Sequence, residues 1–280
     1  MRQYLAVLWF AALMATGLAQ QRPFLTDQPE TLPIGRVRVG FGIEFLQGQH
    51  FTLSGLQGDF TRIGVTNLQV GIGDFAEFQL SGVVQDFLSV SHRSPAAIPP
   101  DFAGNATSDV GDLFLGTKIR FAQEGHIRPA VGFRFSVQLP NASNESGLGV
   151  DETNFYASLL LGKRLGKGEV FGNIGLAIMG SAVVPNTQSD LITYGFGIIL
   201  PVHSKIRLFG DVNGRDGPER IGSENRSQAR VGVQFLAAGL RWDVGAIAGL
   251  GKYDADSGVT LGLTYEFQAF RRTKAVRTIR

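Results

Sequence analysis

The sequence predicts an all-β protein: a transmembrane, antiparallel, up-and-down β-barrel of about twelve strands. Three observations predict it. Apolar and polar residues alternate with a period of two along most of the chain, long and short connections alternate between the expected strands, and the N-terminus has the pattern of an export signal. After that N-terminus, no apolar run of helical membrane-span length occurs in the 280 residues.

The stretch 108–140 shows the alternation most clearly. Apolar residues and one threonine take every second position in 113–121, and apolar residues do so again in 131–137. Lys118, Arg120, Arg134 and Gln138 lie at the positions between them. Successive side chains of a strand point to opposite faces, so each strand has one apolar and one polar face. This arrangement is typical of a sheet with lipid outside and water inside.

The same pattern predicts the other strands in order. They are expected at about 36–45, 62–72 and 77–87, then after the hairpin at 155–161, 170–178, 191–200, 206–213, 229–235, 240–248 and 259–267. Long connections are expected at 47–59, 91–105, 141–152 and 214–226, a medium one at 185–189, and short ones at 73–76, 122–125, 165–168, 201–204 and 236–239.

This alternation of connection lengths favours a membrane barrel over a soluble one. Outer-membrane barrels have short periplasmic turns and long external loops. A soluble sandwich or barrel buries its apolar face inward and does not need to sort its loops. We therefore expect an integral protein in the outer membrane of a Gram-negative-type bacterium, with membrane lipid as its surroundings and the barrel-assembly machinery as a partner during insertion.

Four regions are expected along the chain. Residues 1–19 resemble a cleaved signal peptide, with Arg2 before an apolar core and small residues before Gln20; an uncleaved membrane anchor is the alternative. Residues 20–35 are expected to be a periplasmic lead-in, and 36–267 the outer-membrane barrel. Residues 268–280 form a basic tail, either a disordered end or a contact for anionic head groups or a periplasmic partner.

Several function classes are not supported by the sequence. The chain has no cysteine, which excludes disulfides, thiolate nucleophiles and cysteine metal sites. The four histidines fall in expected loops or turns without a recognisable Ser or Asp partner, so we expect no enzyme, no catalytic residue, no metal site and no cofactor. A net charge of +2 gives no argument for nucleic acid.

Charged residues at inward-facing positions are the candidate functional residues, because charge facing lipid at the midplane costs about 2–4 kcal/mol. These lumen-lining candidates are Arg38, Glu44, Glu77, Lys118, Arg120, Arg134, Arg207, Asp211, Arg230, Arg241, Asp243 and Glu266. Two interpretations stay open. The residues form a mildly cationic passage for anionic or aromatic-acid solutes, or a salt-bridge network that stiffens a narrow, largely filled barrel.

Four short motifs resemble a known family. They are TLPIG at 31–35, GDFAE at 73–77, GDLFLGTK at 111–118, and FSVQLP at 135–140 before a loop rich in Gly and Ser. In this order they are similar to the outer-membrane barrels associated with the meta-pathway of phenol degradation, although Pro140-Asn141-Ala142 stands where that family has Pro-Thr-Gly. The resemblance implies passive passage for small hydrophobic or aromatic compounds. A structural or surface-interaction barrel, with a plugged lumen and external loops as the binding face, is the alternative.

Overall fold

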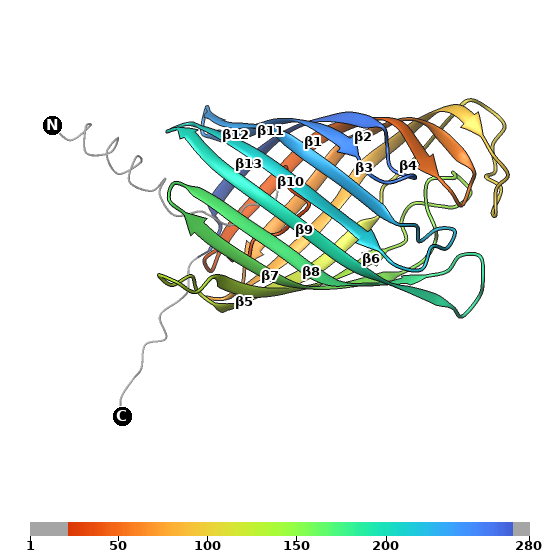
Figure 1. Ribbon diagram of the computed structural model, residues 1–280. Coiled ribbons are helices and arrows are strands. Elements are labelled where there is room, and N and C mark those ends of the chain that lie inside the picture. Colours follow the sequence, from red (N-terminus) through yellow and green to blue (C-terminus); the bar gives the residue numbers. More distant parts are fainter. Residues whose placement is uncertain (1–21, 271–280) are drawn as a thin grey trace.

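The computed structural model describes residues 22–270, which form one β-barrel (Figure 1). Its strands are β1 (Arg36–Phe51), β2 (Leu56–Gly71), β3 (Ala76–Arg93), β4 (Ala106–Asp109), β5 (Leu113–Ala122), β6 (Ala130–Leu139), β7 (Asn154–Leu165), β8 (Gly168–Gly180), β9 (Gln188–His203), β10 (Ile206–Asp216), β11 (Arg226–Ala237), β12 (Leu240–Gly249) and β13 (Ser257–Gln268). Among these residues, no helix is long and apolar enough to cross a membrane.

The sheet closes on itself with antiparallel neighbours throughout. β1 pairs with β13 from Arg36↔Gln268 to Gln47↔Ser257, and the remaining strands follow in chain order around the ring to β2 and β3. The four-residue β4 pairs with residues 86–89 of β3, and β5 pairs with residues 76–81 of the same strand. They therefore act as two segments of one barrel strand, and the expected twelve-stranded antiparallel barrel is confirmed.

The outer face of the barrel is apolar, as the alternation predicted. Phe41 and Ile43 on β1 are each 44% exposed, whereas Glu44 beside them is 2% exposed. The same alternation gives exposed Leu159 on β7 and exposed Val244 on β12. Every backbone group in a closed sheet has a partner on a neighbouring strand, which is the condition for crossing hydrocarbon.

Connections differ in length at the two ends of the barrel. The turns 72–75, 166–167, 204–205 and 238–239 lie at the end where β1 begins and β13 finishes, whereas 94–105, 140–153 and 217–225 lie at the other end (Figure 1). Outer-membrane barrels have short periplasmic turns and long external loops, so the first is the periplasmic end and the second the external end. The expected long loop at 47–59 is wrong. There the β1–β2 ladder continues to Phe51↔Leu56, and Phe51 packs on Phe60 with ring centroids 5.1 Å apart.

Residues 47–59 are polar and were therefore predicted to form a loop. Strand residues that extend beyond the membrane need no apolar face, so a polar composition does not exclude a strand there. In the structure these residues extend the strands outward, and only 52–55 turn. The expected signal peptide at 1–19 and most of the basic tail lie outside the described residues, so both remain predictions.

A lipid-facing charge tests this orientation. Leu159 lies near the middle of β7 and pairs with Phe133 and Ile174. We expect Leu159→Arg to lower the free energy of unfolding by about 2–4 kcal/mol, and Val184→Arg, in the exposed connection 181–187, by about 0–1 kcal/mol. Urea unfolding in lipid vesicles measures both, and equal losses would contradict the assigned faces.

Candidate functional site: the barrel lumen

Residues 22–34, which we call the lumen segment, lie inside the barrel. The expectation of a periplasmic lead-in is therefore wrong for this part of the chain. Phe24, Thr26, Asp27, Gln28 and Leu32 are each at most 3% exposed. Three prolines at 23, 29 and 33 interrupt any regular pattern, and no sequence pattern indicated that the barrel interior would cover this polar stretch.

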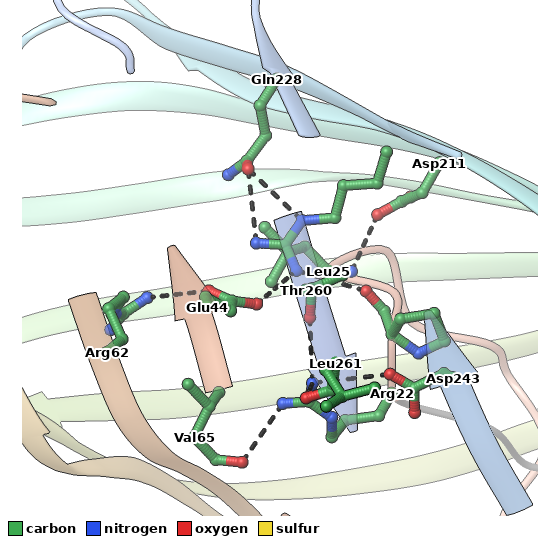
Figure 2. A network of polar contacts seen from close by, with 12 residues as sticks. Arg22, Leu25, Glu44, Arg62, Val65, Asp211, Gln228, Asp243, Thr260 and Leu261 are labelled. Atoms are coloured by element: carbon green, nitrogen blue, oxygen red, sulfur yellow. Dashed lines mark hydrogen bonds and ion pairs between the residues drawn. The ribbon is translucent and has the colours of Figure 1, made fainter. Parts of the chain in front are cut away.

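Arg22 fixes the beginning of the segment against strands on one side of the lumen (Figure 2). Its guanidinium donates hydrogen bonds to the Thr260 hydroxyl on β13 at 3.1 Å and to the Val65 carbonyl on β2 at 3.2 Å. It also lies 3.6 Å from a carboxylate oxygen of Asp243 on β12. Gln234 of β11 donates to the Arg22 carbonyl at 3.2 Å. Four strands thus hold one residue.

The next residues are held by apolar packing on the adjoining part of the wall, formed by β8, β9 and β10. The Phe24 ring meets Phe171 and Phe209 edge-on, with centroids 5.1 and 5.4 Å away, and these three side chains form a buried cluster with Ile199. The Leu25 N–H donates to the Asp211 carboxylate at 2.8 Å (Figure 2).

Asp27 lies between two cations of the wall. Its carboxylate oxygens are 3.8 Å from Lys118 Nζ and 3.1 Å from Arg134 Nε. Lys118 Nζ is also 3.1 Å from Glu77, whose carboxylate accepts a hydrogen bond from the Leu32 N–H at 2.8 Å. Lys118 and Glu77 are fully buried. This group contains two positive and two negative charges. One of the negative charges, that of Asp27, comes from the lumen segment.

Glycines in the strands make room for the segment. A Cβ placed at Gly195 would lie 3.1 Å from Thr26 Cβ and would clash with the Thr26 hydroxyl oxygen. A Cβ at Gly162 would lie 2.8 Å from ring atoms of Pro29. Interiors packed this closely have no space for added atoms, so a larger residue at either position would push the segment aside unless it is covalently bonded to the segment.

The structure brings most of the twelve lumen-lining candidates into polar contacts. Seven are buried: Arg38, Glu44, Glu77, Lys118, Asp211, Arg230 and Asp243. Five are partly buried: Arg120, Arg134, Arg207, Arg241 and Glu266. Arg120 donates to the Asp74 carbonyl at the periplasmic turn. Among residues 22–270, Arg207 and Arg241 form no ion pair with a carboxylate.

Two further ion-pair groups lie away from Asp27. Glu44 on β1 pairs with Arg230 on β11 at 2.7 Å, although β13 and β12 lie between these strands in the sheet, and with Arg62 on β2 at 3.5 Å. Arg230 also donates to the Pro23 carbonyl at 3.4 Å. Near the periplasmic end, Glu266 pairs with Arg38 at 2.6 Å and with Arg36 at 2.8 Å.

A cavity of about 640 Å³ lies on the external side of the lumen segment, and we call it the outer cavity. Phe24 and Leu25 line it on the segment side, Phe114 and Tyr156 belong to its wall, and residues 147–150 of the β6–β7 loop line it on the external side. The rings of Phe114 and Tyr156 are 6.0 Å apart. The outer cavity therefore combines aromatic surface with a polar wall.

A smaller inner cavity of about 290 Å³ lies on the periplasmic side of the segment, lined by Glu30, Arg120, Glu124 and Lys163 among others. Glu124 belongs to the β5–β6 connection. Burial acts to raise the pKa of its carboxyl, but hydrogen bonds from Arg164 and Lys163 outweigh it and lower that pKa to about 2. Glu124 therefore remains an anion in moderately acidic solution, and its stabilising contacts are lost only as the pH falls toward that pKa.

The sequence patterns missed two groups of lumen residues. Phe171, Ile199 and Phe209 are apolar residues at inward positions on three consecutive strands. Apolar residues that face a polar lumen could have indicated that a chain segment packs against them inside the barrel. Arg215 and Arg226 were assigned to the charged loop 214–226. The β10–β11 ladder continues to Arg215↔Arg226, so both line the outer cavity.

Comparisons with known proteins agree with this fold. No family model matches the sequence, and no curated protein was found to match it. Among solved structures, the chain is similar to the COG4313 outer membrane channel from Pseudomonas putida F1, with 16% identity, a TM-score of 0.59, and coverage of 85% of this chain and 97% of that one.

It is also similar to the translocator domain of the autotransporter NalP from Neisseria meningitidis, with 12% identity, a TM-score of 0.53 and 95% coverage of both chains. At these identities the likeness is one of fold. The closed barrel with its apolar outer face is an integral outer-membrane β-barrel.

The buried charges around Asp27 give a stability prediction. We expect Lys118→Met to lower the free energy of unfolding by about 3–5 kcal/mol, because Glu77 would lose its buried partner. Lys167→Met, in the exposed turn before β8, should change it by no more than about 0.5 kcal/mol. Urea unfolding in vesicles measures both variants. Equal stability of the two would show that the Lys118 ion pair is not needed.

Proposed function

We propose that this barrel gives small hydrophobic or aromatic compounds a passive, non-enzymatic route across the outer membrane, and that the lumen segment controls that route. One observation carries the proposal: an aromatic-lined outer cavity and a separate inner cavity lie on opposite sides of a single chain segment. Passage between them requires the segment to move, because Thr26 and Pro29 lie in contact with the wall.

Two similarities support this proposal. The motifs at 31–35, 73–77, 111–118 and 135–140 resemble the barrels associated with the meta-pathway of phenol degradation. The Pseudomonas putida protein of similar fold is described as an outer membrane channel. An aromatic cavity is also the surface expected to hold apolar solutes.

A structural or surface-interaction barrel is the second candidate, and the ion pairs of the lumen favour it. Arg22 and Asp27 are buried and contact several strands each. A segment held in this way would make the lumen a permanent core, and the external loops would then be the functional surface.

Solute uptake separates the two candidates. Vesicles carrying the protein and an outer leaflet of lipopolysaccharide, which slows apolar solutes, should take up an uncharged aromatic such as benzyl alcohol faster than protein-free vesicles. Planar-bilayer recordings of the same protein report ion passage. If neither uptake nor conductance exceeds the protein-free level, the structural role is favoured.

A reversible disulfide tests whether the lumen segment controls the passage of solutes. The chain has no cysteine, so Thr26→Cys with Gly195→Cys provides one defined pair. The two Cβ positions are 3.1 Å apart, a few tenths of an ångström below the usual disulfide range of about 3.5–4.5 Å. We expect the oxidised protein to lose aromatic uptake and the reduced protein to regain it.

Each single cysteine variant, treated with the same oxidant, is the control and should show no redox dependence. Equal uptake by the oxidised and reduced double variant would mean that solutes pass without movement of the segment.

A further inference from the structure

We infer that Arg215 and Arg226 form a binding site for small aromatic carboxylates at the external end of the outer cavity. This inference deepens the proposed function and rests on it for the later passage of the bound solute. The two arginines are direct cross-strand partners on β10 and β11, and both line the outer cavity. Like charges placed directly opposite each other in a sheet destabilise the strand pair. A bound anion between the two arginines would relieve that repulsion.

Both guanidinium groups are held in place by neutral groups. Arg215 Nε donates to the Glu224 carbonyl at 2.9 Å. Arg226 donates to the carbonyls of Tyr253 and His50, each at 2.9 Å. Backbone carbonyls fix the side chains without cancelling their charge. Among residues 22–270, neither arginine forms an ion pair with a carboxylate.

The nearby carboxylates already have other partners. Glu224 accepts hydrogen bonds from the Gly222 N–H at 2.5 Å and from the Thr52 hydroxyl. Asp254 accepts from the N–H groups of Ser227 at 2.7 Å and Gly251 at 2.9 Å. These two acids shape the external loops and moderate the local charge. The other arginines of the cavity differ, because Arg62, Arg134 and Arg230 all have ion-pair partners.

The surroundings of the arginine pair select the rest of the ligand. The Tyr156 hydroxyl faces Arg215 and donates to Gln138 at 2.8 Å. The ring of Tyr156 lies beside that of Phe114, and Phe24 lines the cavity on the side of the lumen segment. A carboxylate held by the planar guanidinium groups would therefore point an attached ring at aromatic surface. This combination fits an aromatic carboxylate better than inorganic phosphate or an uncharged aromatic.

Binding to the purified protein tests the site without requiring transport. Calorimetric titration in detergent micelles would use sodium benzoate, with benzyl alcohol as its uncharged counterpart. We expect the Arg215→Gln, Arg226→Gln double variant to bind benzoate at least about tenfold more weakly, because charge-assisted hydrogen bonds are lost. Affinity for benzyl alcohol should stay unchanged.

Two further variants test whether the loss of any external arginine, or the loss of charge alone, accounts for weaker benzoate binding. Arg93 is an external arginine that also donates to a carbonyl and lies over an aromatic ring, but it does not line the outer cavity. The Arg93→Gln variant should therefore bind benzoate with unchanged affinity. The Arg215→Lys, Arg226→Lys variant keeps the charge and loses the planar geometry, so it should bind with intermediate affinity. Heat-modifiable migration in gels confirms that each variant is folded.

Three results would overturn the inference: no benzoate binding by the unmodified protein, equal benzoate affinity in the double glutamine variant, or displacement of benzoate by an equal concentration of phosphate. Benzoate binding as expected without aromatic uptake into vesicles would contradict the proposed function alone. Uptake without this binding would contradict only the present inference.

Discussion

Charge pairing inside a closed wall is the constraint on which this structure depends. A barrel in lipid must turn its charged side chains inward, where buried ions need partners. The wall supplies part of these partners, as in Glu44 with Arg230. The lumen segment supplies others, since Asp27 lies between Lys118 and Arg134, and Arg22 meets Asp243. The segment is thus a component of the electrostatic core of the barrel.

The same segment gives the lumen its two chambers. Glycines at 195 and 162 leave space for Thr26 and Pro29, and an apolar cluster of Phe171, Ile199 and Phe209 receives Phe24. The shape of the inner wall at these positions is therefore complementary to the lumen segment in its observed position. They also explain how an aromatic outer cavity can exist above a filled interior, which is the arrangement from which both the solute route and the anion site are inferred.

Sequence patterns predicted the barrel well because alternation and backbone pairing are local properties. The hairpin at 113–139 and the short turn at 166–167 follow directly from them. Errors occurred where strands leave the membrane. Gln47 to Phe51 of β1, Arg215 of β10 and Arg226 of β11 were assigned to loops, because a strand beyond the bilayer no longer needs an apolar face. That error concealed two cavity-lining arginines.

The sequence by itself determined that the chain forms an antiparallel barrel of about twelve strands with an apolar outer face, since a period of two and the cost of charge in lipid leave little choice. Only the tertiary structure decided which charges meet, and that residues 22–34 lie inside the barrel. Those contacts join residues far apart in the chain, such as Arg22 with Thr260, and no local pattern records which distant strands will surround a segment. Closure of the barrel brings them together, and with them the two cavities.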